Sequence, residues 1–287
     1  MKLSVCLATY QEAKNIHFAL DSVIDFADEV VVVDGGSTDG TVAILQSYGP
    51  KVRIISTTNK PMFHINKQMA LDAARGEWIL QLDADEEITT EMRDEILQII
   101  DEGSATPDHT SPIAYQIPRR NFFLGRPLMK GGVYPDYTIR LYKNGTMYFP
   151  CKDVHENVVP KGEQRAKYTE QSEKGREKGK WLGTMEHPMN HYSDPDFQRY
   201  LTRWKRYNAA EAKRVIEHAE RLHNDDHARF VLWSIVFIMK AFTVLPLMWF
   251  FRTYIRHKGF MDGWQGLVFH GMSALRWWGI GWNVLRA

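Results

Sequence analysis

The stretch Trp78-Ile79-Leu80-Gln81-Leu82-Asp83-Ala84-Asp85-Glu86 is an apolar run that ends in three carboxylates. Such a run predicts a buried strand with a polar carboxyl end. Two carboxylates at positions i and i+2 can point at one cation, and carboxylate oxygens are the ligands that Mg²⁺ or Mn²⁺ prefers. The structural alternative is a strand-to-helix turn in which Asp85 or Glu86 caps the next helix. The stretch therefore predicts either a metal site or a helix cap.

Strand and helix patterns alternate on both sides of this stretch. Strands are predicted at residues 2–8, 29–33, 52–55 and 78–82, and helices at 13–26, 38–48, 66–74, 90–100 and 195–222. The helix at 66–74 is expected to end at Gly76, which would act as its C-cap. Strand patterns return at 113–160, and the highly charged residues 161–180 predict a surface loop. This alternation predicts an α/β fold with a parallel sheet covered by helices, in which ligands bind beyond the carboxyl ends of the strands.

Three polar clusters follow the ends of predicted strands, at Thr9-Tyr10, Asp34-Gly35 and Asp83-Ala84-Asp85. Because parallel strands run the same way, the three clusters are expected at one edge of the sheet. Asp34 can accept a hydrogen bond from a pyrimidine N–H, and the glycines after it allow close approach of the backbone. Asp39 either binds the nucleotide or caps the following helix. The sequence has no glycine-rich dinucleotide motif and no phosphate loop, so metal and side chains are expected to hold the phosphates.

Composition limits the classes of function. Lys and Arg total 36 and Asp and Glu total 35, which gives a formal net charge of +1. A nearly neutral chain does not suggest nucleic-acid binding, so no nucleic-acid partner is expected. Cys6 and Cys151 are too few for a disulfide framework or a structural zinc site. The apolar run at the N-terminus is too short for a signal peptide, so we expect a cytoplasmic protein.

The C-terminal residues 223–287 are rich in apolar side chains and tryptophan. Residues 230–251 reach the length of about 20 that spans a bilayer, but Lys240 lies in the middle and Pro246 interrupts the second half. Basic residues and four tryptophans follow this segment. The composition predicts an amphipathic helical tail that lies on a membrane surface. The alternatives are an ordinary packed helical tail and a spanning helix.

The chain resembles the inverting family-2 glycosyltransferases of the GT-A fold through motifs at 7–12, 33–41 and 74–86, which occur in that order. Motifs at 117–126, 131–135, 139–142 and 154–156 are similar to those of bacterial lipopolysaccharide-core and surface-polysaccharide enzymes. The resemblance implies a mixed sheet flanked by helices, with a helical membrane-associating extension. The expected catalytic domain is 1–222, with a nucleotide half at about 1–110 and an acceptor half at about 111–222. The tail is expected at 223–287.

The resemblance also implies roles for individual residues. Glu156 matches the catalytic carboxylate and becomes the expected general base, but the family commonly has Glu-Asp where this chain has His155-Glu156, so His155 is the second candidate. A cation, Mg²⁺ or Mn²⁺, is expected on Asp85 and His191, with Asp83 as a further ligand or a ribose contact. The nucleotide-sugar donor is expected to contact Thr9, Tyr10, Glu12, Asp34, Gly35, Lys67, Asp83, Ala84 and Arg140. For Arg140 there are two interpretations: it contacts a phosphate or the acceptor, or it forms a surface ion pair.

The expected reaction is inverting transfer of a sugar from a nucleotide diphosphate, with a UDP-sugar the favoured donor, to an acceptor hydroxyl. The expected acceptor is a glycan or glycolipid of lipopolysaccharide or another cell-surface glycan, and the expected location is the inner face of the cytoplasmic membrane. One alternative is a polyprenyl-phosphate glycosyltransferase, whose phosphate nucleophile needs no general base. A sugar-nucleotide pyrophosphorylase would need a glycine- and arginine-rich loop near the N-terminus, which the sequence lacks. A further alternative is an inactive nucleotide-sugar-binding scaffold.

Overall fold

The computed structural model describes residues 1–105, 112–151, 157–162, 181–225 and 227–286. It divides into two compact units, which are treated separately below. The first unit combines Met1–Arg119 with Asp136–His191, and the second combines Arg120–Pro135 with Tyr192–Ala287. This division differs from the predicted boundary near residue 222, because the long helix after residue 195 belongs with the tail. The predicted charged loop lies almost entirely outside the described residues, since 163–180 are not among them.

The main sheet is mixed, as the GT-A resemblance implies. Its strand order is β3 (Val52–Ser56), β2 (Glu29–Asp34), β1 (Leu3–Thr9), β4 (Trp78–Gln81), β8 (Asp136–Lys143), β6 (Ala114–Phe123), β12 (Met189–Asp194) and β5 (Glu86–Glu87). The pairs β1–β2, β2–β3 and β1–β4 are parallel, which confirms the prediction for the first hundred residues. The pairs β4–β8, β6–β8 and β12–β5 are antiparallel. Shorter strands complete the set: β7 (Arg126–Pro127) and β11 (Leu182–Thr184) pair with β6, and β9 (Met147–Tyr148) pairs with β10 (Val159–Pro160).

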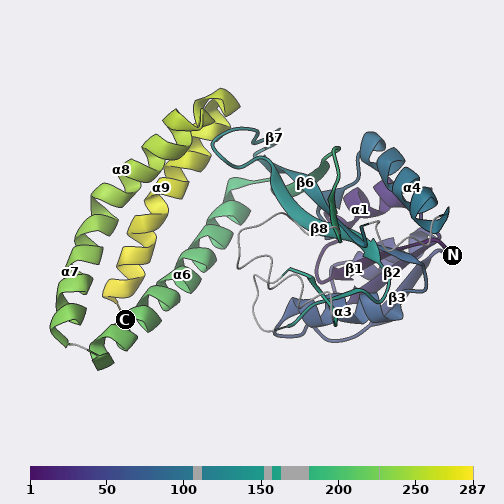
Figure 1. The fold of residues 1–287 in the computed structure, drawn as a ribbon, viewed down its shortest axis with the longest axis horizontal. Helices are drawn as coiled ribbons and strands as arrows, with labels where there is room; N and C mark the ends of the chain where they lie inside the picture. The colour runs from purple at the N-terminus through teal and green to yellow at the C-terminus, as the bar shows by residue number, and fades with distance from the viewer. Residues whose placement is uncertain (106–111, 152–156, 163–180, 226, 287) are drawn as a thin grey trace. The chain divides into compact units, whose positions relative to one another are not determined.

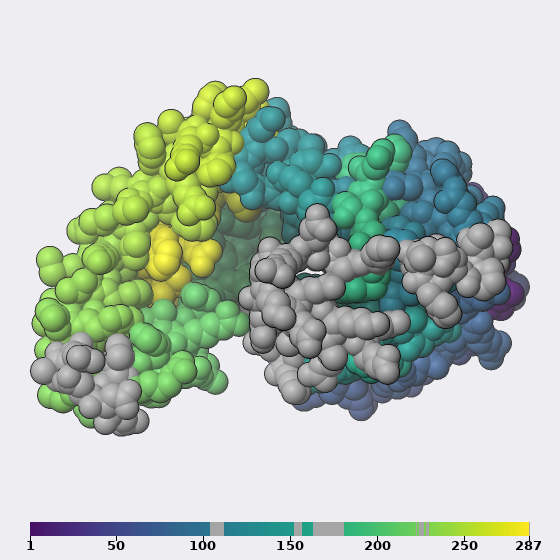
Figure 2. Space-filling model, in the orientation of Figure 1, coloured from purple at the N-terminus to yellow at the C-terminus, as the bar shows by residue number. Residues whose placement is uncertain are grey.

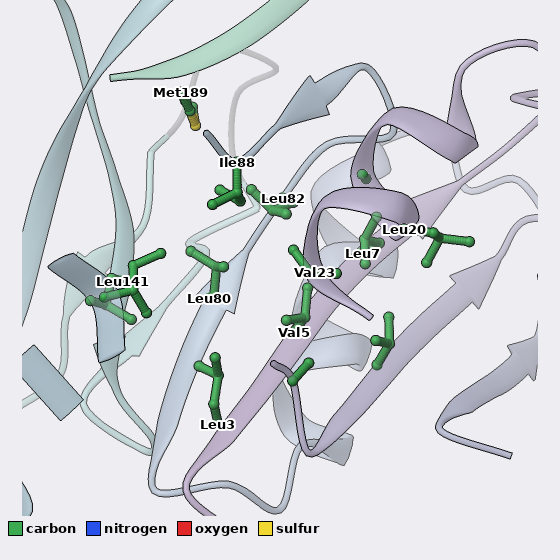
Figure 3. Packing of buried hydrophobic residues seen from close by; sticks show 14 of the residues in the cluster. Leu3, Val5, Leu7, Leu20, Val23, Leu80, Leu82, Ile88, Leu141 and Met189 are labelled. Carbon is green, nitrogen blue, oxygen red and sulfur yellow. The ribbon is translucent and has the colours of Figure 1, made fainter. Parts of the chain in front are cut away.

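Helices cover both faces of this sheet (Figure 1). They are α1 (Ile16–Val23), α2 (Thr41–Ser47), α3 (Phe63–Ala73) and α4 (Thr90–Ala105). Alternate residues of β1 point to opposite faces, because side chains alternate along a strand. Leu3, Val5 and Leu7 pack in one apolar cluster with Leu20 and Val23 of α1 (Figure 3), a cluster that also includes residues of α4. Cys6 packs in a second cluster with residues of α3. The result is a three-layer core that holds the strand ends in place.

Gly76 does not cap α3, contrary to the sequence prediction. The helix ends at Ala73, and Ala74 is already extended, with φ −68° and ψ 143°. Gly76 lies instead where the chain enters β4 beside β1, and its N–H donates to Ser4 Oγ at 2.7 Å. A Cβ at this position would lie 2.6 Å from the backbone nitrogen of Ser4. The glycine is therefore required by a close contact between backbones, which local sequence does not reveal.

We expect Gly76→Ala to lower the free energy of unfolding by about 1–3 kcal/mol, because the new methyl group overlaps the backbone of β1. Urea unfolding followed by circular dichroism measures this change. Gly271→Ala is the matched control, since a Cβ there meets nothing within 4 Å and the residue lies within a helix. Alanine should leave that helix unchanged or stabilise it by up to about 1 kcal/mol. Equal stability of both variants would contradict the close-contact explanation.

The second unit is built mainly from helices, namely α6 (Phe197–Asp225), α7 (His227–Phe242), α8 (Val244–Phe250) and α9 (Gly263–Leu285). A π-helical turn η1 (Phe251–Arg256) and a 3₁₀ turn η2 (Gly259–Asp262) join α8 to α9. The predicted helix at 195–222 is thus confirmed and extends to Asp225. Helix α9 packs against α6, α7 and α8. Trp204 Nε1 donates to the carbonyl of Met272 at 2.9 Å, which ties α6 to α9.

The apolar segment of the tail is broken where proline predicts a break. Proline clashes with the carbonyl four residues earlier, and for Pro246 that residue is Phe242, at which α7 ends. The Phe242 carbonyl accepts a hydrogen bond from Trp278 Nε1 at 3.2 Å. Among the described residues, no single helix meets the length and hydropathy of a membrane span. In that same described part of the chain, one pair of helices, Phe230–Phe242 and Val244–Arg256, meets the length and hydropathy jointly, with a bend of 45° between them.

Candidate functional site

The first unit brings the ends of β1, β2 and β4 to one edge of its sheet. Thr9 and Asp34 are direct partners in the parallel β1–β2 register, and Cys6 pairs with Gln81 near the end of β4. The loops that begin at residues 9, 34 and 82 therefore start from neighbouring strands. This is the geometry expected of a ligand site in an α/β sheet.

Asp34 shapes the loop that follows it. Its Oδ2 accepts the backbone N–H groups of Gly36 and Ser37, both at 2.9 Å. Its Oδ1 accepts the hydroxyls of Ser37 at 2.6 Å and Thr9 at 3.2 Å. Four donors match the acceptor capacity of a carboxylate. Asp34 is thus a structural element of the loop, and its contact with the donor stays a prediction.

Asp39 joins the second loop to the first. Its Oδ1 accepts the backbone N–H of Thr41, the first residue of α2, at 3.1 Å, although the N-cap position itself is occupied by Gly40 and not by Asp39 as predicted. Its Oδ2 accepts the N–H of Ala13 at 3.0 Å. Gln11 adds two contacts, because its N–H donates to Ser37 Oγ and its side chain donates to Thr38 Oγ1, each at 2.9 Å. Residues 9–13 and 34–41 therefore form one connected surface.

The remaining predicted donor residues of these two loops differ in exposure. Tyr10 is 44% exposed, so its ring is available for contact with a planar ligand. Glu12 accepts a hydrogen bond from Asn15 Nδ2 at 2.7 Å at the start of α1. The N–H of Gly35 donates to the Thr9 carbonyl at 2.8 Å, and a Cβ on Gly35 would lie 3.2 Å from the Cα of Asn59. Gly35 thus lies where loop backbones approach closely.

Asp83 lies between two cations. Lys67 Nζ forms an ion pair with Oδ1, and Arg140 Nη2 donates to Oδ2 at 2.7 Å. Partial burial raises the pKa of Asp83, but the attraction of Arg140 and Lys67 is stronger and holds that pKa well below its usual value. Both oxygens are therefore engaged with protein cations. A role of Asp83 as metal ligand stays a prediction, as does its ribose contact.

Arg140 is buried rather than part of a surface ion pair, with 5% of its surface exposed. Besides Asp83, it donates to the side-chain oxygen of Gln81 and to Glu86 Oε1, the latter at 2.5 Å. A planar guanidinium can serve these acceptors together, whereas an ammonium group cannot match the same fixed geometry. Arg140 therefore joins the end of β4 to the turn before β5.

Glu86 is a site residue for which the sequence indicated only a helix cap. It is fully buried, and its Oε1 faces Arg140 at 2.5 Å and Arg119 at 3.3 Å. Its Oε2 accepts the N–H of Asp83 at 2.9 Å. The cap of α4 is instead Thr89, whose Oγ1 accepts the N–H of Met92 at 3.3 Å.

Arg119 was also missed by the sequence analysis, together with its partner Asp136. The two residues face each other across β6 and β8, and Arg119 Nη2 donates to Asp136 Oδ2 at 2.6 Å. Opposite charges placed across neighbouring strands stabilise the pair. The sequence contained one indication of this network. Three carboxylates follow the apolar run at 78–82 and need cations as partners, and Arg119 and Arg140 lie within predicted strands.

Asp85 and His191 form a separate pair beside this network. His191 Nε2 lies 3.7 Å from Asp85 Oδ1, and the antiparallel β5–β12 register places His191 opposite Glu86. Burial lowers the pKa of His191 more than the nearby Asp85 raises it, which favours the neutral imidazole that binds metals.

The Asp85–His191 separation fits one shared cation. Two ligand atoms at about 2.1 Å from the same Mg²⁺ ion lie at most about 4.2 Å apart. Within the described ranges, no cluster of three or more His, Cys, Asp or Glu side chains is arranged to hold a metal. Two protein ligands would leave several positions of the cation for water and phosphate oxygens, as is usual for Mg²⁺ sites. The metal assignment stays a prediction.

A pocket of about 180 Å³ opens beside the charged network. Lys67 lies in it between two aromatic rings, with Nζ 5.1 Å from the centre of Phe63 and 5.9 Å from that of Phe149. The predicted catalytic residues Glu156 and His155 lie outside the described residues. The pocket is lined by Phe63, His64, Lys67, Gln81, Asp83, Arg119, Thr138, Ile139, Arg140, Phe149, Asn157 and Val158.

Comparison with known proteins adds independent information. The sequence profile of Glycosyl transferase family 2 matches residues 4–152. An uncharacterized glycosyltransferase of Rickettsia bellii is 28% identical over 274 residues, which cover 93% of this chain and 80% of the relative. The lipopolysaccharide core biosynthesis glycosyltransferase LpsC of Rhizobium meliloti is 31% identical over 137 residues, or 47% of this chain and 48% of LpsC.

A solved structure supports the fold. The mannosyltransferase PcManGT from Pyrobaculum calidifontis, in complex with GDP-Man and Mn²⁺, aligns with a TM-score of 0.51 and 16% identity, covering 99% of this chain and 87% of PcManGT. The likeness confirms the predicted GT-A type of mixed α/β fold. With more than half of its residues matched by the family profile, this chain belongs to glycosyl transferase family 2.

Proposed function

We propose that this glycosyltransferase moves a sugar from a UDP-sugar to a hydroxyl of a glycan or glycolipid acceptor, with inversion at the anomeric carbon. The observation that carries the proposal is the Asp85–His191 pair, 3.7 Å apart, at the sheet edge that also holds the loops after β1 and β2. The similarity to LpsC, a lipopolysaccharide core biosynthesis glycosyltransferase, supports a role in lipopolysaccharide or other cell-surface glycan synthesis. The unit that contains residues 1–119 and 136–191 is the proposed catalytic unit.

In this proposal the chain's own residues bind and orient the substrates. Thr9, Tyr10 and Glu12 contact the base, with Asp34 and Gly35 beside them. Asp83 and Ala84 face the ribose, and Lys67 and Arg140 hold Asp83 in place. When bound by Asp85 and His191, a divalent cation supplies positive charge to the leaving diphosphate.

Glu156 is the proposed general base that removes the proton of the acceptor hydroxyl, and His155 is the second candidate. Asn157, the next residue in the chain, lines the pocket that also contains Asp83 and Lys67. This neighbourhood supports placing the base near the donor. The accelerating effects are positioning of the two substrates and stabilisation of the leaving group.

The donor class is tested by thermal unfolding with a panel of nucleotide sugars, with and without Mn²⁺. A UDP-sugar should raise Tm in the presence of Mn²⁺, because a ligand at about 100 times its Kd stabilises by about 2.7 kcal/mol. A shift with GDP-sugars alone would contradict the UDP assignment. Absence of any shift with every nucleotide sugar would contradict the proposed activity.

Asp85→Ala should weaken Mn²⁺-dependent UDP binding about tenfold or more, since even residues that only orient metal ligands contribute factors of 10–100. Isothermal calorimetry with UDP, with and without Mn²⁺, measures this loss. Asp94→Ala is the control, because Asp94 is an exposed aspartate that pairs with Arg93 on α4. Unchanged UDP affinity of Asp85→Ala in Mn²⁺ would remove Asp85 from the metal site.

A polyprenyl-phosphate acceptor is the second candidate, favoured by the apolar side chains that α7, α8 and α9 expose. A phosphate nucleophile carries its own negative charge and needs no general base. For either acceptor, we propose that the protein is peripheral on the inner face of the cytoplasmic membrane, where lipid-linked glycan acceptors are accessible.

A further inference from the structure

The helices α7 and α8 and the turn η1 expose a stripe of large apolar side chains. On α7 the spacing of Leu232, Ile235 and Met239 places them on one helical face, and on α8 the same holds for Val244, Leu247 and Met248. Figure 2 shows the α7–α8 segment, in light green, at the molecular surface. The members of the stripe are between 37% and 73% exposed: Leu232, Ile235, Val236, Met239, Val244, Leu247, Met248, Phe251 and Ile255.

This stripe is not the packing face of its helices. The buried residues Ala241, Pro246 and Thr253 lie on the other side of α7, α8 and η1. Trp249 also points away from the stripe, because its Nε1 donates to Ser273 Oγ of α9 at 2.9 Å. The stripe therefore faces away from α9. Nine large apolar side chains in one band exceed the isolated apolar residues usual on a protein surface, which indicates an interaction surface.

The charged residues of α7, α8 and η1 are all basic. Residues 227–287 contain seven Lys and Arg but a single acidic residue, Asp262. Asp262 is buried, and its carboxylate accepts the N–H groups of Met129 at 3.2 Å and Lys130 at 2.9 Å. The cations Lys240, Arg252, Arg256 and Lys258 are all exposed within or directly after the stripe. The surface is therefore apolar along its centre and cationic at its margin.

Helix α9 contributes side chains suited to the same environment. Trp264, Trp278 and Trp282 are exposed and lie on one face of α9, because their spacings are close to whole numbers of helical turns. Tryptophan is enriched at membrane–water interfaces, where its ring is apolar and its N–H meets water. All three helices that pack together in the tail beyond α6 thus expose residues typical of an interfacial helix.

We propose that the α7–α8–η1 stripe lies in the interface of an anionic phospholipid bilayer, with the flanking cations on the lipid headgroups. This inference rests on the proposed peripheral location and assigns its surface and lipid class. Anionic headgroups complement the cations, and acyl chains accept the apolar stripe. A second copy of this chain is a poorer occupant, because a symmetric contact through this face would bring the same exposed cations together.

Co-sedimentation of the full-length protein with lipid vesicles tests the proposal. We expect binding to vesicles that contain phosphatidylglycerol, weak binding to phosphatidylcholine alone, and loss of part of the binding at high salt because the headgroup attraction is screened. Tryptophan fluorescence should shift to shorter wavelength, and brominated lipids should quench it. Binding that is equal on both vesicle types, or no binding and no spectral change, would overturn the proposal.

The double substitution Leu247→Asp with Phe251→Asp should lower vesicle binding about tenfold or more, because two apolar anchors are lost and two anions are added. Leu97→Asp is the matched control, since Leu97 is an apolar residue of α4 that is 38% exposed. Equal binding of both variants and wild type would exclude this stripe. A dimer in light scattering that the double substitution dissociates would identify a second copy as the occupant instead.

Vesicle binding can be tested independently of the proposed catalytic activity. The Tm shift with UDP-sugar and Mn²⁺, measured without vesicles, should be the same in the stripe variant and in wild type. Loss of vesicle binding with an intact donor shift supports the docking surface, whereas a protein that binds vesicles but no nucleotide sugar contradicts only the proposed activity. Loss of the donor shift together with vesicle binding would show that the variant is unfolded. In that case the wild-type fluorescence and quenching decide the proposal.

Discussion

Glu156→Gln should lower kcat by about 10²- to 10⁴-fold, the usual contribution of a general base, while donor binding stays unchanged. Glutamine keeps the size of the side chain but cannot accept the proton of the acceptor hydroxyl. Sugar transfer measured by release of UDP gives kcat, and calorimetry with UDP and Mn²⁺ gives donor affinity. A lower kcat with unchanged donor affinity indicates a lost base, whereas loss of both kcat and donor affinity indicates a misfolded site.

Glu87→Gln is the control for this substitution. Glu87 is a carboxylate of β5 that accepts a hydrogen bond from Asn190 Nδ2 at 2.8 Å and has no proposed role in the chemistry. It should retain nearly full turnover. If Glu156→Gln is also nearly fully active and His155→Gln is not, His155 is the base. If both variants transfer sugar at the wild-type rate, a phosphate acceptor that needs no base is favoured.

Arg140→Leu should lower the free energy of unfolding by about 3–5 kcal/mol, because removing one partner of a buried ion pair leaves the other charge uncompensated. Asp83 and Glu86 would both lose their contact with the guanidinium. Urea unfolding measures the change. Arg93→Leu is the matched control, since its ion pair with Asp94 is exposed and should contribute about 0.2–1 kcal/mol.

A second substitution tests the reason for this loss. If an uncompensated buried carboxylate destabilises Arg140→Leu, adding Glu86→Gln should recover part of the stability. The free energy of unfolding of Arg140→Lys should lie between those of wild type and Arg140→Leu. An ammonium keeps the charge but cannot donate to Gln81, Asp83 and Glu86 with the geometry of a guanidinium. Stability of Arg140→Leu equal to that of Arg93→Leu would show that the network does not stabilise the fold.

Much of the fold follows from local sequence. The β-branched run of β2 and the apolar runs of β1 and β4 allow few conformations other than buried strands, and alternating helices make those strands parallel. The break before Pro246 is equally local, because it follows from the ring and missing N–H of one residue. The prediction that Gly76 caps α3 was wrong, because the need for glycine arises from a contact that is not local in sequence. The partner that requires glycine there is Ser4, far away in sequence.

The candidate site also combines features that local sequence predicts with features that depend on tertiary contacts. By itself, the sequence determined that Thr9, Asp34 and Asp83 lie at or directly after the carboxyl ends of parallel strands, because the alternation of strand and helix patterns is a local property. Only the tertiary structure decided which charges meet. Arg119 and Arg140 reach Glu86 and Asp83 because antiparallel strands from the second half of the first unit pair beside β4. The energy of such a network depends on distances and burial between distant residues, which no local pattern records.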